Sequence, residues 1–400
     1  MSVFSPRPIY SSGYEFDGIG AFEVLRGGAA IAVSDGWTSV YWNPANLSDQ
    51  AGRYRREIGI EIRVGGMTAN DPNSFNLPGA NPFDKNKLNY SVFTGSLGGM
   101  FNLKSGWGLG FGAYCPLMQG SSFNDNANHP VYSSLDYEGF AVIEVNNVSV
   151  SRQISDRFSV GAGLDIIYGR LKSDSGIGFN FHPIFFNSGI QTTKLEGSGW
   201  NAEGVFGLKY NLNSRWILGA VFRTGSRVKI KGKAESQYNA ISEKSDFEFL
   251  LKHPPTSGVG AALKFNKDTV VSVDFTQTWW KGFSNKVTYD NPQTLLQNQS
   301  NTFDWKNSWK VRLGFVKTLS EKTGIVGGYA FDVPAIDSGS VDFSTAIDVP
   351  MHRFSFGLRK RWKAGRLTFG GLCGLGKRSE NEGNYKVSGW YFISEYTVKI

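Results

Sequence analysis

The sequence predicts an all-β protein, a 14-stranded antiparallel transmembrane β-barrel with a small N-terminal plug (hatch) inside it. Three observations support this prediction. Apolar and polar residues alternate along most of the chain, as in strands with one apolar face. Short and long connections alternate between these strands, as in outer-membrane barrels. The first 50 residues do not alternate and are rich in small residues.

The composition argues against a helical membrane protein. The chain has 400 residues, of which 14% are aromatic and only 19% are charged, and it contains 49 glycines. No window of about 18 consecutive apolar residues is present, so a transmembrane helix is excluded. The strands of a transmembrane barrel escape this criterion because only every second residue faces lipid.

The N-terminal segment predicts a plug. Residues 27–48 read GGAAIAVSDGWTSVYWNPANLS, in which small residues precede aromatic ones. Asn43 is predicted to be a helix N-cap and Pro44 the first helical residue. A barrel of about 14 strands is too wide for its own side chains to fill, so a segment folded inside it would close the pore. We expect residues 1–50 to form the hatch and residues 51–400 the barrel; a loose periplasmic extension is the alternative for the first segment.

The alternation assigns the two faces of each strand. In TVVSVDFTQTW, Val271, Val273 and Phe275 lie on one face, and Ser272 and Asp274 lie on the other. The same pattern recurs in WGLGFGAY, FSVGAGLDIIYG, WKVRLGFV and HRFSFGLRKRW. We predict strands centred on Ile60, Phe93, Phe111, Val145, Leu164, Val205, Val221, Ala261, Val273, Leu313, Gly328, Phe356, Gly370 and Ile393.

The connections between the strands predict the two ends of the barrel. Every even-numbered strand precedes a short connection: LKSGW, SDR, NLNSR, NKD, SEKT and KAGR. Every odd-numbered strand precedes a longer segment, such as SDSGIGFNFHPIFFNSGIQTTKLEG. The chain ends on a strand, YFISEYTVKI, which can close the barrel and leave no unpaired edge in lipid. A soluble sandwich or propeller also alternates, but it does not usually combine strands of about 10 residues with this rhythm.

The ordered motifs resemble a known family. The segment Asn43-Pro44-Ala45-Asn46-Leu47 is similar to the Asn-Pro-Ala-Gly-Leu-like motif that ends the N-terminal stretch of FadL/TodX-type outer-membrane transporters of long-chain fatty acids and aromatic hydrocarbons. WNAEGVFGLKYNLNSRW, HPPTSGVGAALKFNKDTVVSVDFTQTWWKGF and VPMHRFSFGLRKRW resemble later parts of these barrels. The resemblance covers nearly the whole chain. It implies a 14-strand barrel with an N-terminal hatch, and it assigns Asn43, Pro44, Ala45 and Leu47 to the hatch motif.

The sequence carries no recognisable catalytic or metal-binding constellation. The four histidines are scattered without metal-ligand spacing, and neither a nucleophile elbow nor a phosphate loop is present. The alternate glycines of GLGFG are expected to clear space inside the barrel for the plug or a ligand. We therefore expect no enzyme, no cofactor and no metal.

The net charge and the two cysteines say little about the partners or the cellular compartment of the protein. The net charge of +8 comes without a basic block, so nucleic acid is not an expected partner. The start, MSVFSPRPIY, has no apolar core and does not resemble a signal peptide. Cys115 and Cys373 are far apart in sequence and are either bridged or free.

An apolar loop is the first candidate ligand-binding element. Phe179, Phe181, Ile184, Phe185 and Phe186 fall in one of the long, outward-facing connections. Apolar clusters of this density on a surface usually mark a binding site, although these side chains could simply roof the barrel mouth. FadL-type proteins capture their ligands with hydrophobic outer loops, so the resemblance favours capture.

Three inward-facing cations are the second candidate. Arg223, Arg312 and Arg353 occur at lumen-facing positions of their strands. One or more of them can bind the carboxylate head of a ligand whose tail lies in an apolar pocket. The alternative is that they pair with lumen carboxylates such as Asp165 or Asp274, or with the plug.

These observations predict passive uptake of hydrophobic small molecules, either long-chain fatty acids or aromatic hydrocarbons, across the outer membrane of a bacterial cell. Outer-membrane lipid and lipopolysaccharide are the expected surroundings. Apolar loops collect the ligand, an interior pocket holds it, and a plug movement or a gap in the wall releases it. A porin for polar solutes and a structural or adhesive surface barrel are the alternatives. A porin would have a polar outer loop and an open lumen.

Overall fold

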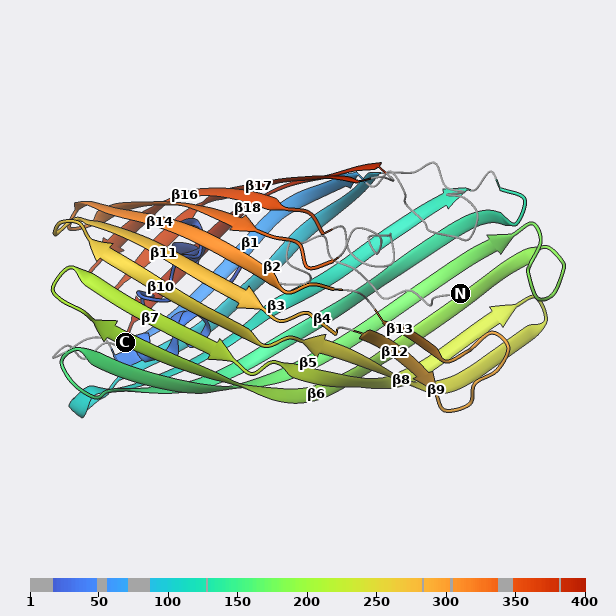
Figure 1. Cartoon of the computed structure of the whole chain (residues 1–400), viewed down its shortest axis with the longest axis horizontal. Coiled ribbons are helices and arrows are strands. Elements are labelled where there is room, and N and C mark those ends of the chain that lie inside the picture. The colour runs from blue at the N-terminus through green and yellow to red at the C-terminus, as the bar shows by residue number, and fades with distance from the viewer. Residues whose placement is uncertain are drawn as a thin grey trace.

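A single antiparallel sheet closes on itself to form a barrel (Figure 1). The computed structural model describes residues 17–48, 56–70, 87–126, 129–282, 284–302, 305–336, 348–380 and 383–400. The strands are β1 (Arg56–Asn70), β2 (Lys87–Asn102), β3 (Trp107–Asn126), β4 (Tyr132–Gln153), β5 (Phe158–Phe179), β6 (Gly189–Asn211), β7 (Trp216–Arg223), β8 (Ser226–Tyr238), β9 (Ile241–His253), β10 (Thr256–Lys264), β11 (Thr269–Thr278), β12 (Ser284–Tyr289), β13 (Gln299–Thr302), β14 (Ser308–Ser320), β15 (Thr323–Asp332), β16 (Met351–Trp362), β17 (Gly365–Glu380) and β18 (Gly383–Lys399). Because β1 pairs with both β2 and β18, the last strand seals the cylinder, as predicted.

Four wall strands are each interrupted once, so the 18 segments of the sheet make 14 wall strands. The successive halves are β7 and β8, β9 and β10, β11 and β12, and β13 and β14. Between β7 and β8, Gly225 has a positive φ of 69°. Between β9 and β10 stand Pro254 and Pro255, which have no backbone N–H to continue the ladder. Each of the 14 predicted centres lies in a different wall strand, which confirms the predicted fold class.

In the half of the barrel nearer the short turns, the outer surface is apolar and the lumen is polar. On β1, Ile60 is 51% exposed, whereas the alternate residues Glu61 and Arg63 are 2% and 1% exposed. On β11, Val273 is 44% exposed and Asp274 is 1% exposed. Since side chains alternate across a strand, this pattern places apolar groups where lipid surrounds the cylinder and charged groups inside it.

The two ends of the barrel differ as predicted. The short connections lie at the end that holds the C terminus, and most of the longer ones lie at the other end (Figure 1). Segments 71–86 and 337–347, which belong to two of the predicted long connections, are outside the described residues. In the described part of the chain, no helix is long and apolar enough to cross a membrane. Cys115 and Cys373 are both free thiols.

Several segments predicted as loops are strand extensions instead. The β3–β4 ladder continues to Asn126↔Ser134, and the β5–β6 ladder continues to Phe179↔Gly189. The β8–β9 hairpin runs on to Tyr238↔Ile241. These extensions carry polar residues on their outer face, so they lack the apolar alternation by which the lipid-facing parts of the strands were recognised.

Candidate functional site

Residues 17–48 form a hatch that lies inside the barrel near its short-turn end (Figure 1). Trp37, Val40 and Leu47 are 0% exposed, and they fill the lumen at this level. The predicted boundary at residue 50 lies outside the described residues and stays a prediction. The elements of the hatch are helix α1 (Ala21–Leu25), helix α2 (Ser39–Trp42) and the 3₁₀ turn η1 (Pro44–Ser48).

Asn43 and Pro44 begin the last turn of the hatch, and the Asn43 side chain links this turn to another hatch segment and to the barrel wall. Asn43 is extended and Pro44 begins the 3₁₀ turn, while Asn43 Oδ1 accepts a hydrogen bond from the Ala45 amide at 3.0 Å. This geometry agrees with the N-cap prediction. Asn43 Nδ2 donates to the carbonyl oxygens of Ile31 in the hatch at 2.8 Å and Leu208 in β6 at 3.0 Å.

Glycines on the inner face of the wall let the backbone of the hatch approach the strands. A Cβ added to Gly328 would collide with the backbone of Gly27. A Cβ added to Gly108 would lie 2.5 Å from the Leu47 carbonyl oxygen, and one added to Gly161 would collide with Ala45. A Cβ added to Gly110 would lie 2.7 Å from the Val40 side chain. The contacts of Gly108 and Gly110 confirm the prediction that the alternate glycines of GLGFG clear space for the plug.

Buried charges fix the hatch to the wall. The Glu57 carboxylate in β1 accepts hydrogen bonds from the Arg366 guanidinium at 2.8 and 2.9 Å and from the Trp37 amide of the hatch at 3.1 Å. Within the hatch, burial raises the pKa of Glu23, an effect that the neighbouring Arg26 guanidinium opposes. Each carboxylate is therefore held in a network of buried hydrogen bonds and charges.

Asp274 binds the hatch backbone. Its carboxylate accepts hydrogen bonds from the Ala30 amide at 2.6 Å and the Ile31 amide at 2.8 Å. The sequence analysis offered Asp274 as a carboxylate partner for the inward-facing arginines, whereas these hydrogen bonds are with the hatch backbone. A carboxylate that accepts hydrogen bonds from two backbone N–H groups attaches the hatch to the wall strongly and directionally in a low-dielectric lumen.

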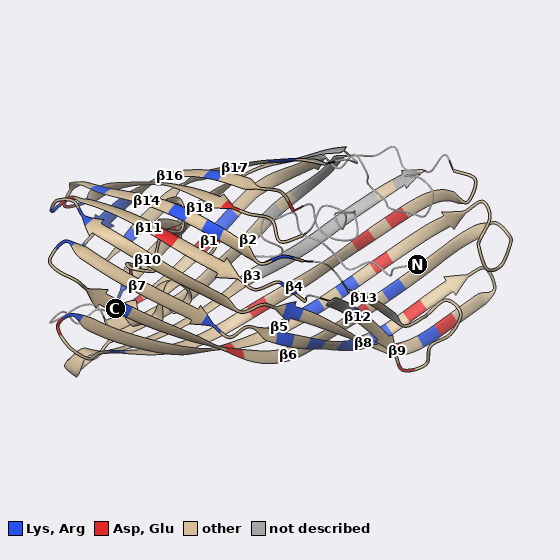
Figure 2. Ribbon diagram, viewed as in Figure 1, with Lys and Arg blue, Asp and Glu red and all other residues tan. Residues whose placement is uncertain are grey.

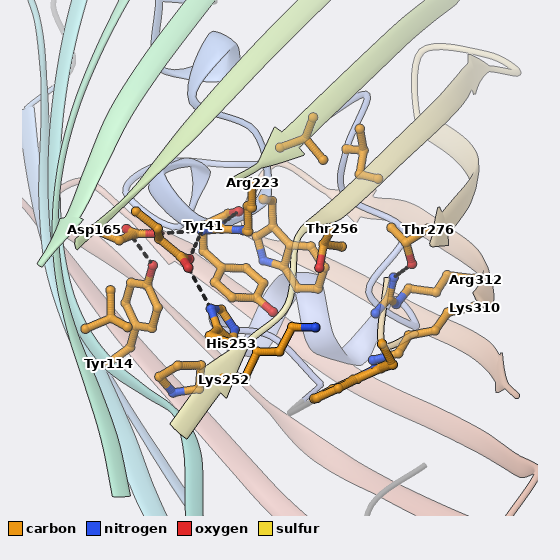
Figure 3. A pocket seen from close by; sticks show the side chains of 17 residues that line it. Tyr41, Tyr114, Asp165, Arg223, Lys252, His253, Thr256, Thr276, Lys310 and Arg312 are labelled. Atoms are coloured by element: carbon orange, nitrogen blue, oxygen red, sulfur yellow. Dashed lines mark hydrogen bonds and ion pairs between the residues drawn. The ribbon is translucent and has the colours of Figure 1, made fainter. Parts of the chain in front are cut away.

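A cavity of about 80 Å³ lies between the hatch and the wall (Figure 3). Apolar and aromatic side chains form much of its lining: Ile31, Tyr41, Trp42, Tyr114, Pro116, Val145, Val221 and Trp280. Its polar lining consists of Asp165, Glu203, Arg223, Lys252, His253, Thr256, Thr276, Lys310 and Arg312. Apolar walls with a few charged groups are the usual lining of a small-molecule site.

Arg223 is held in a polar network on one side of the cavity (Figure 3). Its Nη1 lies 2.6 Å from the Asp165 carboxylate, and its Nη2 donates to the Tyr41 carbonyl oxygen of the hatch. Asp165 also accepts hydrogen bonds from Tyr114 at 3.2 Å and Asn147 at 2.5 Å. The guanidinium is thus neutralised by a lumen carboxylate, which is the alternative that the sequence left open for this residue.

Arg312 has different partners. Its Nη1 donates to the Thr276 hydroxyl at 2.9 Å, and its guanidinium carbon lies 5.8 Å from the centroid of the Trp42 ring. Among the described residues, no carboxylate oxygen lies within 4.0 Å of this guanidinium. The side chain is 7% exposed and lines the cavity. The cavity therefore holds a buried cation beside an aromatic surface, an arrangement suited to an apolar molecule with one anionic group.

Arg353 departs from the sequence prediction of a ligand-binding cation. It is not among the residues that line the cavity, and its guanidinium forms ion pairs with Asp17 and Asp332. The partners come from the start of the hatch and from β15, so their proximity depends on how the hatch docks. With two carboxylates at its guanidinium, Arg353 serves as a structural link between hatch and wall.

Sequence reasoning missed several residues of the cavity. Lys310 precedes Arg312 by two positions and shares its inward face, so the alternation could have identified it. Tyr41 and Trp42 lie in the hatch, where no strand periodicity exists. Trp280 follows the end of β11 at an interruption of the wall, and it packs against Trp305 with ring centroids 4.9 Å apart. No local pattern marks such a position.

The five predicted apolar loop residues divide into two groups at the tip of the β5–β6 hairpin. Phe181, Ile184 and Phe186 are 46%, 49% and 68% exposed, and the Phe181 and Phe186 rings lie 5.6 Å apart. Phe179 is 2% exposed, and Phe185 stacks on Tyr238 with ring centroids 5.1 Å apart. The first group forms an exposed apolar tip, and the second group supports it.

Comparisons with known proteins agree with this architecture. The sequence profile of the family described as outer membrane protein transport protein (OMPP1/FadL/TodX) matches residues 20–353. No curated protein sequence matches the chain.

Solved structures of low sequence identity share the fold. A FadL homologue of Pseudomonas aeruginosa is 12% identical, with a TM-score of 0.75 over 97% of this chain and 99% of that one. The toluene transporter TodX of Pseudomonas putida is 16% identical, with a TM-score of 0.73 over 97% and 99% of the two chains. The toluene transporter TbuX of Ralstonia pickettii is 15% identical, with a TM-score of 0.70 over 96% and 99%.

The profile match covers most of the hatch and most of the barrel, and the apolar exterior, closed sheet and internal hatch are those of an outer-membrane barrel. The chain therefore belongs to the outer membrane transport protein family of FadL and TodX, a family of transport channels for hydrophobic substrates.

Proposed function

We propose that this channel takes up amphipathic molecules that have an apolar body and one anionic head group, with long-chain fatty acids as the prime example. The main support for this proposal is the environment of Arg312. Its buried guanidinium lines the cavity and, among the described residues, has no carboxylate oxygen within 4.0 Å. Asp274, which lies opposite Arg312 in the β11–β14 ladder, accepts its hydrogen bonds from the hatch backbone instead. A buried guanidinium without a directly bonded carboxylate gains most from an anionic ligand.

The rest of the cavity supports an apolar body next to this head group. The Trp42 ring lies beside Arg312, and Val221 and Trp280 belong to the same cavity lining. Of the four cations that line the cavity, Arg223 pairs with Asp165 and Lys310 pairs with Asp332 at 3.8 Å. Among the described residues, no carboxylate oxygen lies within 4.0 Å of the other two, Lys252 and Arg312, which favours an anion over a neutral solute.

A neutral aromatic hydrocarbon is the second candidate ligand. It is favoured by the fold shared with TodX, which is described as a toluene transporter and has a TM-score of 0.73 to this chain. Such a ligand has no charged group, so it would leave the Arg312 guanidinium unpaired. A direct comparison of a charged and an uncharged ligand of equal length distinguishes the two candidates.

The substitution Arg312→Gln tests the proposal. We expect palmitate to bind roughly 10- to 100-fold more weakly to this variant, because a hydrogen bond to a charged group contributes about 1.5–3 kcal/mol. Binding of hexadecane, which lacks the carboxylate, should change little. Both affinities can be measured with radiolabelled ligands on the purified full-length protein in detergent.

Two further variants serve as controls for this measurement. Arg312→Lys retains the positive charge and should recover part of the palmitate affinity. Lys267→Gln removes one positive charge from an exposed short turn and should leave both ligands unaffected. Equal losses for palmitate and hexadecane in Arg312→Gln would show that the substitution disturbs the cavity rather than a head-group contact, and the anionic-ligand proposal would then be wrong.

Capture is assigned to the exposed apolar tip of the β5–β6 hairpin. In the proposal, Phe181, Ile184 and Phe186 provide the first apolar surface that a ligand meets outside the membrane. Their exposure is costly in water, which is typical of a surface that is covered during function. The supporting residues Phe179 and Phe185 hold the tip in place by packing beneath it.

The double substitution Phe181→Ser/Phe186→Ser is expected to slow palmitate uptake severalfold at low palmitate concentration, because it removes two exposed rings of the tip. The affinity of the interior site in detergent should not change. Uptake can be followed with radiolabelled palmitate in cells that depend on this channel. The matched control is Ile154→Ser/Leu212→Ser, which removes two exposed apolar side chains from the short turns; equal slowing in both variants would contradict capture by the tip.

Release is proposed to occur through the wall next to the cavity. The β2–β3 ladder extends from Asn102↔Gly108 to Ser96↔Tyr114, whereas β3 and β4 stay paired to Asn126↔Ser134. The register of β3 shifts directly after Tyr114, and Pro116, which lacks an N–H, lines the cavity at this point. A weakened ladder beside the cavity offers an apolar molecule a route towards lipid.

A further inference from the structure

The outer face of the barrel changes from apolar to basic along β5, β6 and β8. On β5, Leu164 is 51% exposed to the outside, and on β6, Phe206 is 51% exposed. Further towards the long-loop end, the Tyr168 and Trp200 rings lie 4.6 Å apart, and Trp200 is 64% exposed. Aromatic residues of this kind mark the level at which a barrel leaves the hydrocarbon layer.

From the level of this aromatic pair outwards, cations outnumber carboxylates on the outer face of β5, β6, β8 and β9, whereas the neighbouring strand β4 carries the exposed carboxylates Asp136 and Glu138 (Figure 2). The exposed cations are Arg170, Lys172, Lys194, Lys229, Lys231, Lys233 and Lys244, together with Arg227, which lies on β8 four positions closer to the hydrocarbon layer than Lys231. The outward-facing carboxylates on these four strands are Asp174, Glu196, Glu235, Asp246 and Glu248. We call this set of cations the basic face.

Half of the basic face is neutralised by ion pairs within the sheet. The pairs are Arg170–Glu196 at 2.9 Å, Lys194–Asp174 at 3.3 Å, Lys229–Glu248 at 3.0 Å and Lys244–Glu235 at 3.0 Å. Among the described residues, no carboxylate oxygen lies within 4.0 Å of the remaining cations, which are Lys172, Arg227, Lys231 and Lys233.

Strand register brings three of these remaining cations together, Lys172, Lys231 and Lys233, while Arg227 lies four positions from Lys231 on β8. Lys231 and Lys233 are two positions apart on β8, so their side chains leave the same face about 7 Å apart. Glu196 of β6 pairs in register with Lys172 of β5 on one side and Lys233 of β8 on the other, so the two lysines are two strands, or about 10 Å, apart. Ser198 lies next to Lys231 and adds a hydroxyl.

We propose that the basic face binds the phosphate groups of lipopolysaccharide in the outer leaflet of the membrane. The long-loop end of an outer-membrane barrel faces the cell exterior, so the basic face stands just outside the hydrocarbon layer of that leaflet. Clusters of basic residues at such a level bind anionic lipid head groups, and multidentate contacts between cations and phosphate oxygens are strong. The acyl chains of the same lipid meet the apolar band formed by residues such as Leu164 and Phe206.

This site is independent of the transported ligand. The basic face points away from the lumen, and its residues do not line the cavity described above. A failure of the lipid proposal therefore leaves the proposal for anionic cargo untouched, and the reverse is also true.

The test compares two variants with equal loss of positive charge. The first changes Lys172, Arg227, Lys231 and Lys233 to Gln. The control changes four exposed cations of the short turns at the opposite end to Gln, namely Arg157, Lys267, Lys322 and Lys363. Binding of purified rough-type lipopolysaccharide to each full-length protein in detergent is measured by native mass spectrometry.

The basic-face variant is expected to bind lipopolysaccharide at least about 100-fold more weakly, because each basic residue near an anionic lipid surface contributes roughly fivefold. The control variant should bind as the parent protein does. Lipopolysaccharide from which the phosphates have been removed should bind all three proteins equally weakly. Lys231→Gln/Lys233→Gln, with a loss of roughly 30-fold, replaces the fourfold variant if that variant does not fold.

Three results would overturn the proposal. The control variant could lose as much affinity as the basic-face variant, which would indicate an effect of net charge only. Dephosphorylated lipopolysaccharide could bind the parent protein as tightly as the phosphorylated form. Millimolar inorganic phosphate could displace the lipid completely, which would assign the basic face to free phosphate.

Discussion

Deletion of residues 1–48 is expected to turn a closed barrel into a conducting pore. The hatch fills the lumen with side chains that are 0% exposed, including Trp37, Val40 and Leu47. The wall cannot replace them, since a barrel of 14 strands is too wide for its own side chains to fill. Single-channel conductance in planar bilayers should rise severalfold above that of the parent protein. Unchanged conductance would favour an open porin and contradict a plugged channel.

A point substitution tests the same idea without removing the segment. Gly328→Val places a side chain where the backbone of Gly27 lies, so the hatch must shift or leave its seat. Gly327→Val is the matched control, because a Cβ on the neighbouring Gly327 has no contact closer than 3.6 Å, made with Ser355. We expect raised or unstable conductance in Gly328→Val alone; the same change in both variants would indicate general damage to β15.

Glu57→Ala is expected to lower the free energy of unfolding by about 3–5 kcal/mol, because removing one partner of a buried ion pair leaves the other charge uncompensated. Glu57 is 0% exposed, and Arg366, which is 6% exposed, would lose both of its hydrogen bonds to that carboxylate. The Trp37 amide of the hatch would lose its acceptor as well. Urea unfolding of the protein in detergent, followed by tryptophan fluorescence, measures the change.

An exposed pair provides the comparison for this measurement. Glu235 forms an ion pair with Lys244 at 3.0 Å, with side chains that are 48% and 72% exposed. Pairs of this kind contribute about 0–1 kcal/mol, so Glu235→Ala should change stability little. If the two alanine variants lost the same stability, the network that joins the hatch to the wall would not be the cause of the loss in Glu57→Ala.

The barrel architecture could be predicted from the sequence because the patterns that indicate it are local. The alternation of Val271, Val273 and Phe275 with polar residues fixes which side chains face lipid, since successive side chains of a strand point to opposite faces. The lengths of the connections fix which hairpins share an end of the barrel. The polar strand extensions beyond the membrane, such as the β8–β9 hairpin, were missed because they carry no apolar face.

The candidate site was predictable only in part. The sequence identified Arg223 and Arg312 as inward-facing, and both line the cavity. It identified Arg353 in the same way, yet that guanidinium is held by Asp17 and Asp332. Alternation gives the direction of a side chain but not its partner, so the three arginines looked alike.

The sequence by itself determined a closed barrel of 14 wall strands with an apolar exterior, a charged lumen and an N-terminal hatch. Only the tertiary structure decided which charges neutralise one another. Arg223 forms an ion pair with Asp165, and Arg353 forms one with Asp17, across 58 and 336 positions of the chain. Arg312 instead donates a hydrogen bond to Thr276 and lies beside the Trp42 ring. The physical reason is that a local pattern fixes one strand at a time, whereas ion pairs in a barrel depend on register across the sheet and on how the hatch docks.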